Sequence, residues 1–196
     1  MNSQSLLKTL MAAVAAFCAL TAPTAEGTKA SSKILIAFYS YSGNTRAAAQ
    51  QIQGKVGGEL YEIKPQKPYP ANYKHCVAQA KKEILAGFTP PLADEISLEK
   101  YEIIFIGSPN WWGTMAPPVL SFIKLHDFSG KTIIPFFTHG SGGMQNCESD
   151  MIKYCETARA GKILKAAAFL GSSMKTPVPE LVQWAENAVK AAGKKK

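Results

Sequence analysis

The sequence lacks several patterns that would assign a protein to a common class of binding site. The loop after the first apolar run has neither the Gly-Lys-Ser/Thr triplet of a triphosphate-binding loop nor a G-x-G-x-x-G dinucleotide fingerprint. No Cys-x-x-Cys spacing is present, and the three histidines are scattered along the chain. The sequence therefore predicts no triphosphate site, no dinucleotide site and no metal site.

Arginine is scarce. Arg46 and Arg159 are the only arginines among 22 basic residues, and the formal net charge is +8. Nucleic-acid-binding surfaces are usually rich in arginine interleaved with aromatic residues. Because no such stripe is present, nucleic-acid binding is not predicted. The excess of lysine indicates a solvated basic surface, or one that meets an acidic partner protein or an anionic membrane surface.

Long apolar runs are also missing, apart from one short run near the N-terminus. Lys8 precedes apolar residues 9–20, Pro23 follows, and no acidic residue stands before Glu26. This layout predicts a secretory signal peptide over residues 1–25, because the run is too short to span a bilayer comfortably. A buried or amphipathic helix is the alternative. After cleavage the mature chain would be exported (periplasmic or secreted), not membrane-spanning, with a net charge of +7; without cleavage it would be cytoplasmic.

Three cysteines would remain after cleavage: Cys76, Cys147 and Cys155. An odd number allows at most one disulfide within the chain. Cys147 and Cys155 stand eight residues apart, about 12 Å along a continuous helix, which is too far for a disulfide. The disulfide state of the other pairings stays open.

The length and composition predict a single domain, placed at residues 33–191, because 196 residues with 46% hydrophobic composition suffice for one core. Apolar runs predict strands at residues 34–39, 59–64, 102–108, 131–138 and 162–170. Helical periodicity predicts helices at residues 46–56, 73–85, 146–157 and from residues 117 and 179 onward. This alternation predicts an α/β fold, a doubly wound five-stranded parallel sheet with helices on both faces.

The loop between the first strand and the first helix is built from small polar residues, Ser40-Tyr41-Ser42-Gly43-Asn44-Thr45. The first turn of a helix carries unpaired N–H groups and partial positive charge. The hydroxyls of Ser40, Ser42 and Thr45 could donate to phosphate oxygens, and Gly43 would let the backbone bend close to a ligand. The loop therefore predicts a phosphate site. An ordinary serine-rich turn with Thr45 as the helix cap is the alternative.

Two further loops follow strands whose carboxyl ends are expected at the same edge of the sheet, where such folds bind ligands. In Pro109-Asn110-Trp111-Trp112-Gly113-Thr114, a core plug is the alternative to an aromatic wall for a planar ring. We expect Trp112 to stack on the ring and Trp111 to pack inward. After Thr138 and His139, the run Gly140-Ser141-Gly142-Gly143 offers backbone N–H and C=O groups to the edge of a flat ligand; a flexible surface turn is the alternative. We expect His139 to be a neutral polar liner, with a redox-linked proton partner or a helix-entry residue as alternatives.

Together these motifs resemble the flavodoxin-like family. Residues 40–45 match its phosphate-loop pattern Ser/Thr-x-Ser/Thr-Gly-x-Thr in full, and residues 109–113 resemble the Pro-x-Trp-Trp-Gly motif of one branch. That branch also carries a run similar to Phe128-Ser129-Gly130-Lys131-Thr132 and Pro135-Phe136-Phe137-Thr138. The resemblance implies strand order 2-1-3-4-5 and the cofactor FMN. Its phosphate would be bound by Ser40 to Thr45 and its isoalloxazine ring by loops 109–114 and 138–143.

For function, the resemblance implies a non-covalent FMN redox protein that transfers electrons to or from a partner protein. A second hypothesis is an NAD(P)H-dependent FMN enzyme that reduces a quinone or a similar small acceptor. A third is a flavin-free binding module with the same fold. No catalytic residue is assigned under any of the three.

Overall fold

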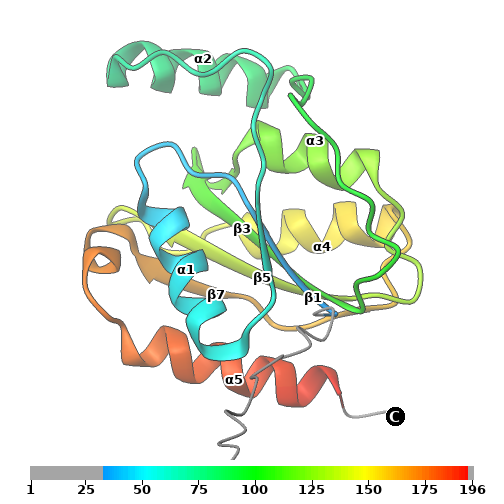
Figure 1. Cartoon of the computed structure of the whole chain (residues 1–196). Coiled ribbons are helices and arrows are strands. Elements are labelled where there is room, and N and C mark those ends of the chain that lie inside the picture. The colour runs from blue at the N-terminus through cyan, green and yellow to red at the C-terminus, as the bar shows by residue number, and fades with distance from the viewer. Residues whose placement is uncertain (1–32, 194–196) are drawn as a thin grey trace, which may run out of the picture. The chain divides into compact units, whose positions relative to one another are not determined.

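The computed structural model describes residues 33–193, in which strands and helices alternate along the chain (Figure 1). The helices are α1 (Asn44–Val56), α2 (Tyr73–Leu85), α3 (Pro117–Leu125), α4 (Cys147–Thr157), the 3-10 helix η1 (Gly171–Lys175) and α5 (Pro179–Ala192). The strands are β1 (Ile34–Phe38), β2 (Glu59–Glu62), β3 (Ile103–Trp111), β4 (Thr114–Met115), β5 (Thr132–His139), β6 (Lys162–Ile163) and β7 (Ala167–Leu170). The predicted signal peptide, residues 1–25, lies outside the described residues.

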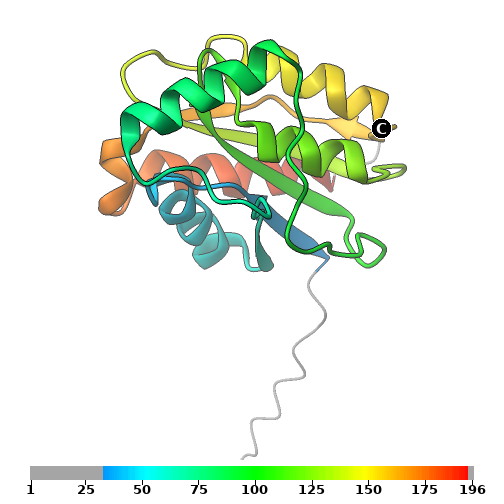
Figure 2. The ribbon, with the colours of Figure 1, turned by 90° about the horizontal axis from the view of Figure 1, so that it is seen from above.

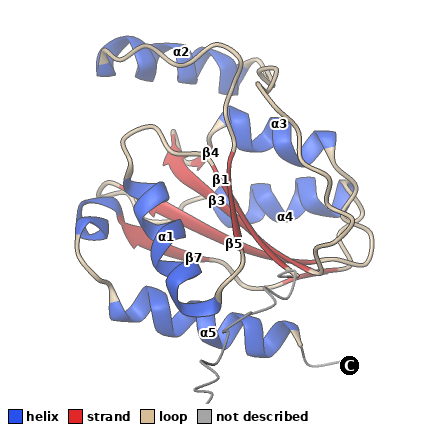
Figure 3. Cartoon of the chain, in the orientation of Figure 1, coloured by secondary structure: helices blue, strands red, loops and turns tan. Residues whose placement is uncertain are grey.

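The sheet runs in the order β2-β1-β3-β5-β6, and every neighbouring pair along this path is parallel. Figure 3 labels its central strands β1, β3 and β5. In strand terms this is the predicted order 2-1-3-4-5, so the predicted fold class is confirmed. The register places Leu35, Ile104 and Ile133 in one row across the three central strands. Such apolar rows are typical of a parallel sheet that is buried on both faces.

The fifth strand differs from the prediction of one continuous strand at residues 162–170. It is split into β6 and β7, which both pair with β5. Lys162 lies opposite Thr132 and Ala167 lies opposite Phe136, so the outer strand has one more residue than β5 between these two pairs. The extra residue forms a bulge, and the N–H of Ala166 there donates to Glu148 Oε1 at 2.7 Å.

Helices cover both faces of the sheet, and each face has its own core (Figures 1 and 2). Alternate residues of a strand point to opposite faces. One face packs on α1 and α5 through the buried residues Ile36, Phe38, Phe105, Ile134 and Phe136. The other packs on α3 and α4 through Leu35, Ala37, Ile104, Ile106, Ile133 and Phe137, and α2 adds Cys76 and Ala80 to this core.

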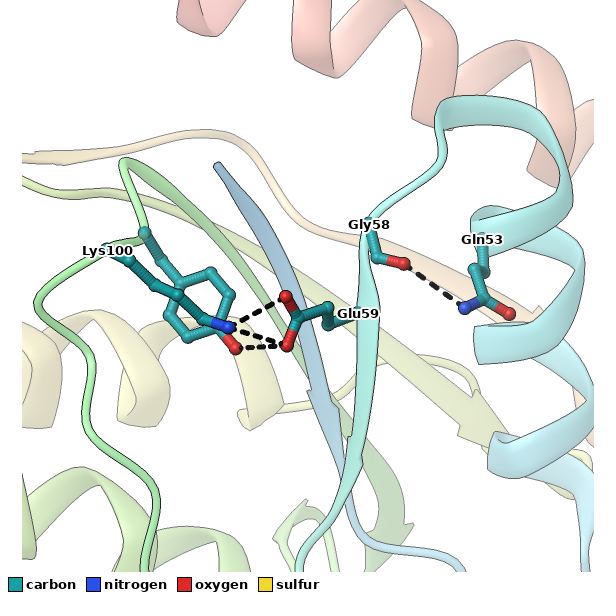
Figure 4. A network of polar contacts seen from close by, with 5 residues as sticks. Gln53, Gly58, Glu59 and Lys100 are labelled. Carbon is teal, nitrogen blue, oxygen red and sulfur yellow. Dashed lines mark hydrogen bonds and ion pairs between the residues drawn. The ribbon is translucent and has the colours of Figure 1, made fainter. Parts of the chain in front are cut away.

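A polar network holds the edge strand β2 to the segment that leads into β3 (Figure 4). Lys100 Nζ donates to both carboxylate oxygens of Glu59 at 2.8 and 3.0 Å, and the Tyr101 hydroxyl donates to Glu59 Oε2 at 2.7 Å. The Glu59 carboxylate beside it raises the pKa of Lys100. On the other side of β2's start, Gln53 Nε2 donates to Gly58 O at 3.2 Å. These bonds lie at the amino end of β2 and leave the carboxyl edge of the sheet open to ligand loops.

Within residues 33–193, no helix combines the length and the apolar character that crossing a membrane would require.

Gly107 gives a test of the packing between β3 and β5. A Cβ atom added there would lie 2.2 Å from Cζ of Phe136, the residue opposite on β5. We expect Gly107→Ala to lower the free energy of unfolding in urea by about 2–3 kcal/mol, because the ring has no space to move in a close-packed core.

Gly54→Ala is the matched control, because a Cβ on this exposed residue of α1 meets no atom within 4 Å. It should raise stability by about 0.4–1 kcal/mol, since alanine restricts the unfolded chain. If both substitutions change stability by the same amount, the packing described at Gly107 is wrong.

Candidate functional site

Four connections gather at the carboxyl edge of the sheet, where β3, β5 and β7 end on the left of Figure 3. They are the β1–α1 loop at residues 39–43, the β3–β4 hairpin, the β5–α4 loop at residues 140–146, and the turn from β7 into η1. The first three were predicted as ligand loops. The fourth was not, because its sequence carries no recognised motif.

The β1–α1 loop ends in a helix start that has no internal cap. Helix α1 begins at Asn44, two residues earlier than predicted, with Gly43 as the N-cap at φ 87° and no side chain capping the helix. No acidic residue stands in the first turn. Thr45 lies inside the helix, so the alternative in which Thr45 is the helix cap is wrong. The free N–H groups and the helix dipole make this end a place for an anion.

Ser40 adds a hydroxyl that lacks a partner. Within residues 33–193, Ser40 Oγ is the one buried side-chain oxygen or nitrogen without a hydrogen bond. A buried hydroxyl left in this way costs about 1–3 kcal/mol, so such groups are normally matched by a ligand or by water. Ser42, two residues later, is exposed. The loop therefore offers unused hydrogen-bond donors directly before a helix N-terminus.

Thr45 is linked to the end of β5. Thr45 Oγ1 and Thr138 Oγ1 lie 2.8 Å apart, and both side chains are buried. Thr138 was predicted together with the glycine loop as part of the ring site. The structure places its hydroxyl beside the first turn of α1 instead.

The predicted Trp-Trp-Gly loop is a tight hairpin and not an open loop. Strand β3 continues through Pro109 to Trp111 and turns back into β4, with Trp111 opposite Thr114. The two turn residues, Trp112 and Gly113, have φ values of 55° and 87°. Positive φ at both central residues is what a type I′ turn requires, and it is strained for a bulky residue such as tryptophan. Backbone strain of this kind is concentrated at ligand sites.

Trp111 packs into a cluster of tyrosines. Its ring meets Tyr39, Tyr41 and Tyr69 edge-on, with centroid distances of 5.5, 5.9 and 4.9 Å. Edge-to-face contacts of this kind add to the stabilisation from buried area. Burial also raises the pKa of Tyr39 and Tyr69, so both stay neutral. Trp111 is thus tied to the core.

Trp112 is held differently, at the surface. Its side chain is 53% exposed, its Nε1 donates to Val77 O of α2 at 3.1 Å, and Lys81 Nζ lies 4.5 Å from the ring centroid. These contacts fix the ring while leaving part of it accessible. The two adjacent tryptophans therefore differ in burial, in the sense expected from the sequence.

Asn110 ties the hairpin to the glycine loop. Its Nδ2 donates to Gly143 O at 2.8 Å and to Gln145 Oε1 at 3.1 Å, while its Oδ1 accepts from the N–H of Gly113 at 3.0 Å. A second link runs from the N–H of Asn146 to Gly113 O at 2.9 Å. The Asn110 amide and this backbone bond therefore join the two loops into one wall.

A cavity of about 520 Å³ lies between these loops and α2, a size within the range of small-molecule sites. The predicted residues that line it are Tyr41, Asn110, Trp111, Trp112, Gly113, His139, Gly140, Ser141 and Gly142. The sequence missed the wall formed by Tyr73, Cys76, Val77, Ala80 and Gln145. In the sequence, the first four of these residues belong to an ordinary amphipathic helix and Gln145 belongs to a loop. No sequence motif therefore marked them as site residues.

Besides Thr138, three residues that were predicted for the ring site do not line the cavity. Pro109 lies in β3 opposite Thr138, and the Thr114 hydroxyl donates to Asp150 at 2.6 Å. Gly143 takes part through its carbonyl, which accepts from Asn110. These residues hold the shape of the loops.

The cavity wall is uncharged. Its lining residues include no carboxylate, lysine or arginine. Burial raises the pKa of the Cys76 thiol, so this group stays protonated at neutral pH. His139 Nδ1 donates to Gly140 O at 2.9 Å, which orients the ring within the loop. The wall therefore suits a neutral, planar group. Tyr41 of the β1–α1 loop also lines the cavity, so the start of α1, here called the anion end, lies next to it.

The turn into η1 closes the anion end from the side. A Cβ atom on Gly171 would come within 2.7 Å of Asn44 Nδ2 and 3.3 Å of His139 O. Glycine at this position therefore allows the turn to lie against the first residue of α1. Ser172 and Ser173 follow as exposed hydroxyl groups.

The comparisons with known proteins agree with this geometry. The model of the family described as Flavodoxin matches residues 33–188. A crystal structure from Bacteroides uniformis, of a protein provisionally described as a flavoprotein, is 30% identical, with a TM-score of 0.67 over 78% of this chain and 97% of that one. No curated protein matches the sequence.

Two further structures show the same fold at lower identity. A flavoprotein from Lactobacillus acidophilus, crystallised in complex with FMN, is 24% identical, with a TM-score of 0.59 over 69% of this chain and 91% of that one. Oxidised flavodoxin 1 from Bacillus cereus is 21% identical, with a TM-score of 0.52 over 81% of this chain and 98% of that one.

The different settings of the two tryptophans predict different effects on stability. We expect Trp111→Ala to lower the free energy of unfolding by about 3 kcal/mol, because a large ring is removed from the tyrosine cluster. Trp112→Ala should change the free energy of unfolding by less than about 1 kcal/mol, because this ring is half exposed and its removal breaks one hydrogen bond. Urea unfolding of both variants without ligand checks this. Equal losses would mean that Trp112 is also part of the core.

Proposed function

The chain belongs to the flavodoxin family, and from this premise we propose that it binds FMN non-covalently and transfers electrons to or from a redox partner. The observation that carries the proposal is the buried Ser40 hydroxyl, which has no partner and stands before an uncapped helix. This pair of features fits a phosphate group, and the uncharged cavity beside it fits an isoalloxazine ring. When bound, FMN supplies one- and two-electron redox chemistry at the site.

The β1–α1 loop would hold the phosphate. Ser40 Oγ and the first N–H groups of α1 are the donors, and Thr45 and the exposed Ser42 add hydroxyls. Gly43, at φ 87°, has no side chain to block the approach of the anion. Hydrogen bonds to a charged oxygen contribute about 1.5–3 kcal/mol each, so this end would supply a large share of the affinity.

The hairpin and the glycine loop would hold the ring. Trp112 offers an accessible aromatic face at the cavity, and the glycine loop offers backbone groups to the ring edge. Asn110 keeps the two loops at a fixed spacing through its bonds to Gly143 and Gln145. Helix α2 closes the remaining side, where Val77 and Ala80 would exclude water from the ring.

The redox partner is a second protein or a small acceptor such as a quinone. The lysine-rich charge of the chain favours an acidic protein partner. Steady-state oxidation of NADPH or NADH with added quinone separates the two: rapid turnover by the purified protein would favour the reductase, and none would favour the electron carrier.

The first test of the proposal is the identity of the cofactor. The protein should purify with a flavin or take one up, and the flavin released by denaturation should run as FMN on chromatography. FMN is expected and not FAD, because the site offers donors for one phosphate group and the sequence lacks a dinucleotide fingerprint. Release of FAD, or no uptake of any flavin, would contradict the proposal.

Ser40→Ala gives a sharper test, because its two effects should have opposite signs. Without ligand, removal of an unpaired buried hydroxyl should leave the unfolding free energy unchanged or raise it. FMN affinity should fall by about 1.5–3 kcal/mol, and the affinity for riboflavin, which has no phosphate, should stay the same. Calorimetric titrations with both flavins measure this. Equal loss for the two ligands would show that Ser40 does not face the phosphate.

A further inference from the structure

Two threonines join the end of β5 to the start of α1. Thr45 Oγ1 and Thr138 Oγ1 are 2.8 Å apart, and the two residues are 93 positions apart in the sequence. Their exposed fractions are 1% and 4%, so water does not reach them freely. The strand order creates this contact, because β5 lies two places from β1 and its carboxyl end reaches the first turn of α1.

The pair holds one more hydroxyl proton than it uses. Each threonine hydroxyl has one proton to donate and two lone pairs to accept. The single bond between them uses one proton, and within residues 33–193 neither hydroxyl makes another hydrogen bond. A buried donor without an acceptor is unfavourable, so the second proton needs an acceptor from a ligand or from water.

The locations of the two threonines indicate which hydroxyl has the proton that is not used in the bond between them. Thr45 lies in the first turn of α1, next to the free N–H groups and the Ser40 loop. Thr138 lies in a strand between two helix layers and does not line the cavity. A proton on Thr45 would therefore point toward the anion end, where an acceptor is expected.

We propose that Thr138 is a positioning residue for the FMN phosphate: its hydroxyl donates to Thr45, and this bond directs the Thr45 proton to a phosphate oxygen. The inference rests on the proposed function. It moves Thr138 from the ring site, where the sequence placed it, to the phosphate site.

The test compares three single variants. Thr138→Val removes the hydroxyl and keeps the shape, Thr138→Ser keeps the hydroxyl, and Thr132→Val makes the same change at the other end of the same strand. Thr138→Val should weaken FMN about 3- to 10-fold and leave riboflavin affinity unchanged, as expected for one hydrogen bond. Thr138→Ser and Thr132→Val should bind both flavins like the wild type. An equal loss of affinity for FMN and riboflavin would indicate that Thr138 acts on the ring, and it would overturn the inference.

A double-mutant cycle tests whether Thr138 acts through Thr45. In a Thr45→Ala background, Thr138→Val should weaken FMN by less than about 2-fold, because the hydroxyl that it positions is gone. Additive losses would show that Thr138 acts on the phosphate independently, and the inference would be wrong.

Inorganic phosphate separates the failure of this inference from failure of the proposed function. Binding of phosphate alone is followed by the amide NMR signals of residues 43–46, in the wild type and in Thr138→Val. If the wild type binds phosphate but no flavin, the proposed function fails, and a weaker phosphate affinity of Thr138→Val still supports the inference. If the wild type binds FMN and Thr138→Val keeps the same preference for FMN over riboflavin, the inference fails alone. Binding of neither ligand overturns both.

Discussion

The unmatched donors at the start of α1 are the constraint on which the site depends. The other α-helices of residues 33–193 each have a feature that reduces this problem, although only α2 has a side-chain cap. Asn72 caps α2 by accepting from the N–H of His75, α3 begins with prolines that have no N–H, and α4 and α5 carry acidic residues in their first turns. Helix α1 has no such device, and the buried Ser40 hydroxyl beside it also lacks a partner. Under the proposed function, the phosphate of FMN would supply the missing acceptors.

The sheet places the unmatched donors at the start of α1 beside the other loops of the candidate site. Parallel pairing brings the ends of β1, β3 and β5 to one edge, so the β1–α1 loop, the β3–β4 hairpin and the glycine loop become neighbours. Positive φ angles at Trp112 and Gln145, 55° and 49°, show that the β3–β4 hairpin and the β5–α4 loop are held in strained conformations. The hydrogen bonds of Asn110 and the contact between Trp112 and Val77 maintain them. The rigid sheet thus supports loops that would not keep this shape alone.

Much of this arrangement could be predicted from sequence patterns. The strand order follows from the alternation of apolar runs and helices together with the resemblance, and the structure confirms it. The hairpin could not be predicted, because Trp-Gly is not one of the dipeptides that signal a type I′ turn. The split of the fifth strand depends on a single extra residue, which leaves no trace in hydrophobicity.

The residues of the candidate site also fall into those that local sequence patterns predict and those that they do not. Short-range motifs located the three loops. Cys76, Val77 and Ala80 line the cavity only because α2 packs over it. The contact of Thr138 with Thr45 joins residues far apart in the chain and follows from strand order and register together. Tertiary contacts of this kind are not encoded in local spacing.

The most direct test of the account is a crystal structure of the protein with FMN. We expect the phosphate within hydrogen-bond distance of Ser40 Oγ and the first N–H groups of α1, and the isoalloxazine ring in the cavity between Trp112 and the glycine loop. FMN bound elsewhere, or bound with Ser40 Oγ still lacking a partner, would contradict the account.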